Sequence, residues 1–324
     1  MKFQRTFYQS SFRNYHFLVL VPMLMMILCN PSSAQEISSS SYGDSTKPAI
    51  IFLHGGPGFN AINFEITTAK KLADLGYYVI TYDRRGEGRS TDKTAMFTYK
   101  QTIDDLLSVF TKYSINKATL IGHSFGGIVA TKFAKEYPSK VSAIVYASAP
   151  IRMQSVFKNI LQTARPFYEK KKDSLNLRYI SMLETMDTNS IEYSSYCFSH
   201  AMVIGAYSPK KMTASATEIY SNFRKDPQSK KAFEMNITAP RGFWKNEQYT
   251  IEDLSEDVKM LQQLNIPMYG LYGLDDGLFS RNELEYIEKI LEKKNFHRLE
   301  NSSHSIFMDT QEEFLSTIGV WLKQ

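Results

Sequence analysis

The stretch Ala118-Thr119-Leu120-Ile121-Gly122-His123-Ser124-Phe125-Gly126-Gly127 places a serine in a tight turn between a mainly apolar run and a segment with a helical pattern. Residues 118–121 have the length and apolarity of a buried strand, and residues 127–137 predict a helix. Glycines two positions before and two positions after Ser124 leave room for a turn so sharp that the serine takes a strained backbone conformation. Alone, Gly-x-Ser-x-Gly is a weak pattern that also fits an ordinary glycine-rich helix start. Its place between a strand and a helix predicts that Ser124 is an exposed nucleophile at a helix N-terminus, where developing negative charge is favoured.

Short apolar runs bounded by glycine or proline recur along the chain. They predict buried parallel strands at 50–53, 78–82, 118–122, 141–147, 268–273 and 296–299. Segments with helical patterns lie between these runs, at about 61–75, 100–113, 125–137, 282–294 and 311–322. The alternation predicts an α/β fold with a mostly parallel sheet and helices on both faces.

The alternation of strand and helix stops between residues 151 and 250. This stretch has no convincing strand and is rich in Met, Tyr and Phe. Helical patterns in it cover residues 153–163 and 175–186. We therefore expect a core formed by residues 48–150 and 251–324, with residues 151–250 inserted as a helical cap after the strand at 141–147.

The composition is that of a globular protein, with 43% hydrophobic and 22% charged residues. The formal net charge is +5, and three of the positive charges lie in residues 1–34, which contain no acidic residue. The remaining chain is close to neutral, which gives no reason to expect nucleic acid as a partner. The two cysteines, Cys29 and Cys197, do not predict a disulfide framework.

The N-terminus has the three parts of a secretory signal. A basic region, residues 1–16, precedes an apolar run of twelve residues, 17–28, and the small residues Ser32-Ser33-Ala34 follow. The run is short for a membrane-spanning helix, which needs about 20 apolar residues. We expect export with cleavage after Ala34 and no stable membrane partner afterwards; retention as an anchor and lipidation of Cys29 stay open as alternatives. The serine-rich residues 35–47 predict a flexible leader into the core.

A glycine-rich loop, His54-Gly55-Gly56-Pro57-Gly58, follows the strand predicted at 50–53. Such a loop lets backbone N–H groups approach a substrate carbonyl oxygen. The N–H groups of Gly56 and Phe125 would together form an oxyanion hole, which stabilises charge that appears only in the transition state. A turn without a chemical role is the simpler alternative.

Two loops carry a resemblance to a known family. The His54–Gly58 loop resembles the signature of the proline iminopeptidase branch of the α/β-hydrolases, and Asp83-Arg84-Arg85-Gly86-Glu87-Gly88-Arg89-Ser90 is similar to the Asp-x-Arg-Gly-x-Gly-x-Ser segment of that branch. The second loop is expected to be structural, held by Asp83 and Arg85. The serine turn departs from the branch, because proline iminopeptidases often have Gly-Gly-Ser-Trp-Gly there. The Gly-His-Ser-Phe-Gly found here is the commoner form among esterases and other relatives.

The α/β-hydrolase fold implies the chain order nucleophile, acid, base. The family pattern Gly-x-x-Asp after the late strand at 268–273 selects Asp276, with the neighbouring Asp275 as the alternative. His304 follows the last predicted strand and precedes a helix, which is the position expected of the base. His304 would take the proton of Ser124 and return one to the leaving group, while Asp276 would orient the imidazole.

These residues predict an exported serine hydrolase that forms an acyl-enzyme on Ser124 and needs no metal or cofactor. The resemblance favours an aminopeptidase that releases N-terminal residues from short peptides, and within the cap Glu192 is the candidate for binding the free amino group of such a substrate. A carboxylesterase or lactonase with the same triad is the alternative, and a ligand-binding protein without catalysis is a remote one. In each case the partner is a small molecule or a short peptide.

Overall fold

A computed structural model of the chain describes residues 36–323. The segment 1–34, for which an export signal is predicted, lies outside the described residues. Residues from Ile37 onward belong to one structural unit. Among the described residues, no helix has the length and apolarity needed to cross a bilayer.

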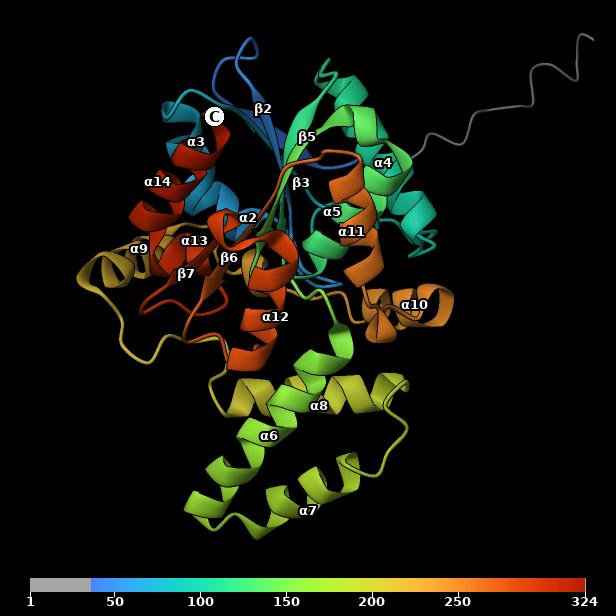
Figure 1. Ribbon diagram of the computed structural model, residues 1–324, viewed down its shortest axis with the longest axis vertical. Coiled ribbons are helices and arrows are strands. Elements are labelled where there is room, and N and C mark those ends of the chain that lie inside the picture. Colours follow the sequence, from blue (N-terminus) through green and yellow to red (C-terminus); the bar gives the residue numbers. More distant parts are fainter. Residues whose placement is uncertain (1–35, 324) are drawn as a thin grey trace, which may run out of the picture. The chain divides into compact units, whose positions relative to one another are not determined.

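Seven strands form a single sheet (Figure 1). In chain order they are β1 (Ser39–Tyr42), β2 (Ala49–Leu53), β3 (Tyr78–Tyr82), β4 (Ala118–His123), β5 (Val141–Ala147), β6 (Met268–Gly273) and β7 (Phe296–Leu299). Their order across the sheet is β1-β3-β2-β4-β5-β6-β7, and only β1 is antiparallel to its neighbour. The carboxyl ends of β2 to β7 therefore meet at one edge, where ligands bind in open α/β sheets.

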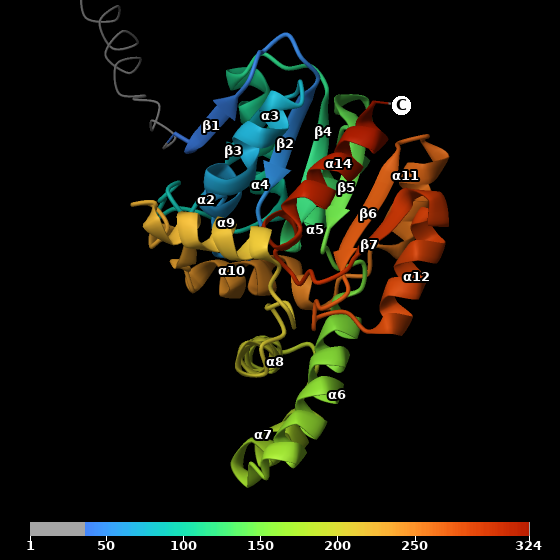
Figure 2. The same cartoon turned by 90° about the vertical axis from the view of Figure 1, so that its left-hand side faces the viewer.

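Helices cover both faces of the sheet because successive strand residues point in opposite directions. In β2, Ile50 and Phe52 pack into one apolar cluster, while Ile51 and Leu53 pack into the other. The first face is covered by α2 (Ile62–Phe64), the π-helical turn η1 (Glu65–Ala69), α3 (Lys70–Asp74), α13 (Ile306–Asp309) and α14 (Gln311–Leu322). The second face is covered by α4 (Tyr99–Lys112), α5 (Phe125–Glu136), α11 (Ser255–Gln263) and α12 (Arg281–Leu291). Figure 2 shows the sheet between these layers. The predicted α/β fold, with its mostly parallel sheet and helices on both faces, is confirmed.

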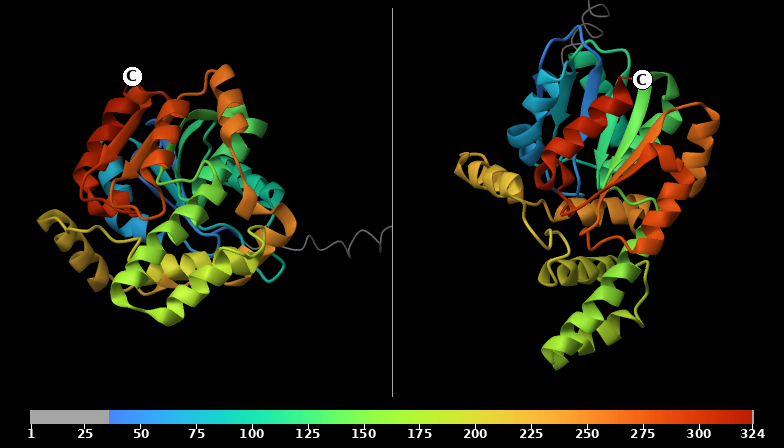
Figure 3. Two further views of the ribbon diagram at one scale, coloured as in Figure 1. Left: turned by 60° about the horizontal axis from the view of Figure 1, so that its bottom comes forward. Right: turned by 60° about the vertical axis from the view of Figure 1, so that its left-hand side comes forward.

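The described residues between β5 and α11 form helices and connecting segments. They comprise α6 (Met153–Lys171), α7 (Ser174–Leu183), α8 (Ile191–Val203), α9 (Ala214–Lys225) and α10 (Thr238–Glu247), with the short turns η3 (Lys231–Phe233) and η4 (Tyr249–Ile251). Helices α7 and α8 both pack against α6, and Figure 3 shows α9 and α10 lying closer to the sheet. The insertion leaves and rejoins the core at one place, because Leu254 donates to the carbonyl of Ile151 over 2.8 Å and Met153 donates to that of Glu252 over 2.9 Å.

The prediction of a flexible leader over residues 35–47 is wrong for Ser39–Tyr42. These residues form β1, which pairs with β3 from Ser39 opposite Tyr82 to Tyr42 opposite Val79. The pairing satisfies backbone groups of β3 that would otherwise be left on an open sheet edge. Three serines followed by a tyrosine carry no apolar alternation, so the strand has no signal in the sequence.

Candidate active site

Ser124 occupies the turn between β4 and α5 with φ 52° and ψ −125°, a strained conformation for a residue with a side chain. The flanking glycines are required by crowding. A Cβ atom at Gly122 would lie 2.6 Å from the carbonyl oxygen of Gly126, and a Cβ atom at Gly126 would lie 2.0 Å from the carbonyl oxygen of Leu53. The turn therefore presses β4 and α5 against the end of β2 and presents the serine at the carboxyl edge of the sheet.

His304 and Asp276 meet at the same edge, on the loops that follow β7 and β6. His304 Nδ1 lies 2.8 Å from Asp276 Oδ2, and both side chains are buried. Asp276 Oδ1 also accepts a hydrogen bond from the backbone N–H of Leu278 at 3.1 Å. Asp275 instead faces Lys210, whose Nζ lies 3.2 Å from Asp275 Oδ1. The structure thus brings Asp276, and not Asp275, to the histidine.

His123 connects the serine turn to the His304 loop. Its Nε2 lies 2.9 Å from the carbonyl oxygen of His304, and the two imidazole rings are 4.8 Å apart. Burial, and then the charge of His304, lowers the pKa of His123 to about 3, so the ring is neutral and Nε2–H donates to the carbonyl. Within residues 36–323 there is no direct hydrogen bond between the Ser124 hydroxyl and His304. Such catalytic contacts often shorten only when substrate binds.

The two backbone amides predicted for the oxyanion hole lie beside Ser124. Gly56 and Phe125 line the same cavity as the serine. Gly56 has φ +121°, which favours glycine, and Phe125 is the first residue of α5, whose N–H has no partner within the helix. In the described part of the chain neither amide donates to another protein group. Both donors are therefore free to bind a substrate oxygen.

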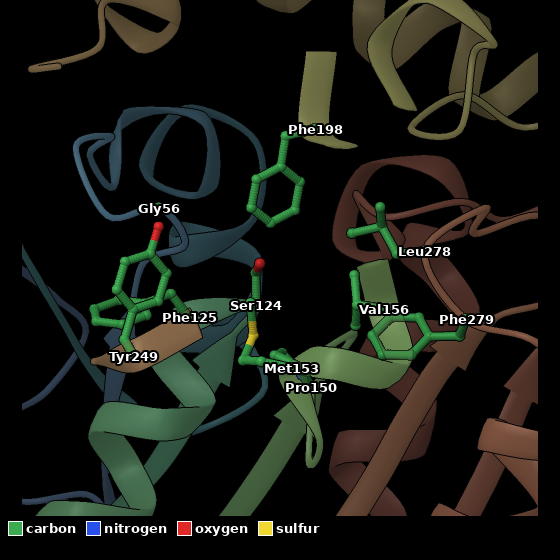
Figure 4. Close-up of a pocket in the computed structure, with 10 residues that line it drawn as sticks. All are labelled: Gly56, Ser124, Phe125, Pro150, Met153, Val156, Phe198, Tyr249, Leu278 and Phe279. Atoms are coloured by element: carbon green, nitrogen blue, oxygen red, sulfur yellow. The ribbon is translucent and has the colours of Figure 1, made fainter. Parts of the chain in front are cut away.

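The cavity above Ser124 is lined almost entirely by apolar groups (Figure 4). Besides Gly56, Ser124 and Phe125, its lining consists of Pro150, Met153, Val156, Phe198, Tyr249, Leu278 and Phe279. Figure 4 shows the serine hydroxyl at the centre, with Tyr249 on one side, Leu278 on the other, and Phe198 facing it from α8. No acidic or basic side chain belongs to this lining. Nor do residues 36–323 contain a group of three or more His, Cys, Asp or Glu side chains arranged to hold a metal ion.

Glu192, the residue predicted to bind an amino group, does not reach this cavity. It is exposed on α8 and is not part of the lining, whereas Phe198 on the same helix is. Three other acidic residues of the cap are also exposed: Glu184 pairs with Arg165, Asp187 accepts the N–H of Asn189 in a turn, and Glu218 lies on α9. The structure therefore gives Glu192 no place beside Ser124.

The loop 83–90 is held by a dense set of ion pairs. Asp83 accepts hydrogen bonds from the N–H of Ala61 and from Arg89, and Arg85 pairs with Asp92 and Asp105. A further pair, between Arg84 and Glu87, is fully buried, with 2% and 0% of the two side chains exposed. Sequence reasoning missed this pair, although an Arg and a Glu three residues apart in a loop of glycines were a visible signal.

Comparison with known proteins agrees with this geometry. The family model described as alpha/beta hydrolase fold matches residues 48–311. A proline iminopeptidase of Lactobacillus crispatus is 23% identical over 287 residues, which cover 86% of this chain and 92% of that protein. The structure of a proline iminopeptidase-related protein from Thermus thermophilus matches with a TM-score of 0.60 and 21% identity, over 89% of this chain and 93% of that one. A structure from work on carboxylesterases of Nitrososphaera gargenis matches with a TM-score of 0.59 and 19% identity, over 90% and 96%. These findings confirm the predicted resemblance to the proline iminopeptidase branch, and the chain belongs to the α/β-hydrolase fold family.

Proposed function

We propose that the protein is a serine hydrolase of carboxylic esters with an apolar acyl group, acting through an acyl-enzyme on Ser124. The observation that carries this proposal is the apolar lining of the cavity around the serine. An aminopeptidase substrate brings a charged ammonium group close to the scissile bond. Burying such a charge without a partner is strongly unfavourable, and the lining supplies no carboxylate to pair with it.

The arrangement supports a two-step acyl transfer. Ser124 Oγ attacks the ester carbonyl carbon, and its proton passes to His304 Nε2, whose Nδ1–H is held by Asp276. The carbonyl oxygen becomes an oxyanion that accepts hydrogen bonds from the N–H groups of Gly56 and Phe125. The C–O bond to the alcohol then breaks, and the alcohol oxygen takes the proton from His304. A water molecule, deprotonated by His304, releases the carboxylic acid and restores Ser124.

The second candidate is an aminopeptidase of the proline iminopeptidase type. It is favoured by the His54–Gly58 loop and by the Lactobacillus crispatus relative, which is matched over most of its length. The sequence alone ranks this activity first. The apolar cavity and the exposed position of Glu192 support the opposite order.

A substrate panel separates the two candidates. Purified protein and Ser124→Ala would be assayed with p-nitrophenyl esters of increasing acyl length and with prolyl and alanyl p-nitroanilides. We expect ester hydrolysis that is lost in Ser124→Ala and an arylamide kcat/KM at least about 100-fold lower. An arylamide kcat/KM equal to or above that of the best ester would reject the ester proposal in favour of the aminopeptidase.

Export remains part of the proposal and is supported by the pattern of residues 1–34. Expression of the full chain followed by N-terminal sequencing of the mature protein tests it. Cleavage after Ala34 is expected, and a protein that keeps Met1 in the producing cell would contradict export.

A further inference from the structure

The peptide unit between Gly55 and Gly56 in the glycine-rich loop is held by hydrogen bonds to its carbonyl oxygen. The carbonyl oxygen of Gly55 accepts a hydrogen bond from Arg84 Nη2 at 2.6 Å and lies 2.8 Å from His54 Nδ1. His54 Nε2 accepts from the backbone N–H of Arg84 at 3.1 Å, and burial lowers the pKa of His54 well below its usual value. The ring is therefore neutral with its proton on Nδ1, and Gly55 receives two donors.

The other end of the same peptide unit is the N–H of Gly56. The Gly55–Gly56 peptide is trans, so its carbonyl oxygen and its N–H point in opposite directions. With the oxygen held toward Arg84, the Gly56 N–H points away from Arg84. Gly56 itself lines the cavity of Ser124.

Arg84 is fixed by further contacts. Its Nε and Nη2 donate to the two oxygens of Glu87 at 3.0 and 2.9 Å, and Nη1 donates to the carbonyl of His54 at 2.6 Å. Glu87 also accepts the N–H of Gly58 at 2.6 Å, so the pair clamps both sides of the loop. The guanidinium carbon lies 5.2 Å from the centre of the Phe125 ring, next to the second oxyanion donor.

Fold stability alone is a weak reason to bury such a pair. The cost of removing two charges from water largely offsets their attraction, so buried ion pairs add little net stability. What the pair does provide is a fixed direction for the hydrogen bonds that Arg84 donates. A guanidinium presents its donors in one rigid plane, and here that plane binds two consecutive carbonyls of the glycine-rich loop.

We infer that Arg84, held by Glu87, is a positioning residue for the oxyanion site: it fixes and polarises the Gly55–Gly56 peptide so that the Gly56 N–H is presented to the substrate oxygen. The inference rests on the proposed acyl transfer at Ser124. Two donors on the Gly55 carbonyl draw electron density along the peptide and make the Gly56 N–H a stronger donor. Arg84 and Glu87 act through the loop and do not touch the reacting atoms.

The test compares transition-state binding with ground-state binding in the full-length protein. Arg84→Gln and Arg84→Lys would be assayed for kcat and KM on the best p-nitrophenyl ester, and for inhibition by an aryl trifluoromethyl ketone, which forms an oxyanion on the serine. Arg89→Gln is the matched control, because Arg89 lies in the same loop as Arg84 but pairs with Asp83 and with Glu65 of η1 and does not contact Gly55. Circular dichroism and unfolding midpoints would verify that each variant is folded.

We expect Arg84→Gln to lower kcat about 30-fold with KM within about threefold, since a misdirected donor costs less than the roughly 10²–10³ seen when a donor is removed. The ketone Ki should rise by the same factor, Arg84→Lys should have kcat and Ki values between those of wild type and Arg84→Gln, and Arg89→Gln should keep kcat despite a lower unfolding midpoint.

A folded Arg84→Gln with wild-type kcat, or with reduced kcat but unchanged ketone Ki, would overturn the inference. If Arg84→Gln does not fold, the same test applies to Arg84→Lys: its kcat must fall and its ketone Ki must rise by the same factor. If the wild type cleaves arylamides and not esters, the proposed function fails, and the ketone series still tests the oxyanion site.

Discussion

The two sides of the site around Ser124 differ in chemistry. On the sheet side, the loops at the carboxyl ends of the strands hold polar groups in fixed hydrogen bonds, among them Asp276, His304 and His123, none of which belongs to the cavity lining. The cap side presents Met153, Phe198 and similar apolar side chains to the cavity. For the proposed acyl transfer, we expect the sheet side to set the reaction and the cap side to select the acyl group.

The largest expected effect comes from the sheet side. His304→Gln removes the base that accepts the serine proton, and we expect kcat for the best ester to fall about a millionfold, as when a member of a Ser-His-Asp triad is removed elsewhere. His297→Gln is the matched control, because His297 lies on β7 with 42% of its side chain exposed and pairs with Glu313. Steady-state assays of both variants check the prediction. A fall of less than about tenfold in His304→Gln would reject the assigned base.

Buried neutral histidines on the sheet side should make the fold sensitive to acid. The pKa of His123 is lowered to about 3 in the native state, whereas in the unfolded chain the same imidazole has its ordinary pKa of about 6.5. Below about pH 6.5 the unfolded chain therefore binds a proton that the native state does not. The stability that comes from His123 is fully present above about pH 6.5 and is lost as the pH falls toward 3. His123 alone should lower the free energy of unfolding by about 2 kcal/mol between about pH 7.5 and about pH 5.

The buried His54 adds to this loss with the same sign, because its pKa is also lowered. Urea unfolding at the two pH values would measure the effect in the wild type and in His123→Gln, whose amide can still donate to His304. The variant should show a pH dependence that is smaller by about 2 kcal/mol. An unchanged dependence would mean that His123 is not kept neutral in the native state.

A substitution on the cap side should change the preference for acyl length and should not affect the chemical step. Phe198 faces Ser124 from α8, so Phe198→Ala would enlarge the acyl pocket. We expect the ratio of kcat/KM for hexanoate to kcat/KM for acetate to rise about tenfold, the effect of one or two methylene groups in an apolar pocket. Tyr196→Ala on the same helix is the control, because Tyr196 is 51% exposed. An equal loss of kcat/KM for all acyl lengths would show that Phe198 affects the chemical step, and would contradict the distinction between the sheet side and the cap side.

The smallest expected effect concerns the hydrogen bonds that connect the cap to the loop carrying His304. Tyr220 on α9 donates to Asp309 Oδ1 at 2.8 Å, and Asp309 Oδ2 accepts the N–H of Ser303, the residue before His304. Tyr220→Phe removes one hydrogen bond and should cost about 1 kcal/mol in the free energy of unfolding. Because Asp309 keeps its bonds to Ser303, kcat should change by less than about threefold. Urea unfolding and ester assays measure both, and a large loss of kcat would show that the cap also positions the base.

The same contrast explains what could be predicted from the sequence. The turn at Ser124, the loop at Gly56 and the strands that carry them have spacings imposed by backbone geometry. The family pattern Gly-x-x-Asp selected Asp276 over Asp275. The cap has no such constraint, because any apolar side chain of suitable size can line a pocket. Glu192 was chosen for its charge and for the likeness of Ile191-Glu192 to the family's cap motif. The antiparallel β1 was missed because pairing with β3, and not its own residues, makes it a strand. The spacing of Arg84 and Glu87 was a signal for their pairing, but it does not reveal their contacts with His54 and Gly58, which lie about 30 positions away.

We propose that Ser124 carries the acyl group of an ester during turnover. A direct test is to quench the protein in acid during steady-state hydrolysis of p-nitrophenyl hexanoate and to measure intact and peptide masses. We expect a burst of about one p-nitrophenolate per chain and a hexanoyl adduct on the peptide that contains Ser124, both absent in Ser124→Ala. Turnover by Ser124→Ala at the wild-type rate, or a hexanoyl adduct on another residue that forms and decays as fast as turnover, would contradict an acyl-enzyme on Ser124.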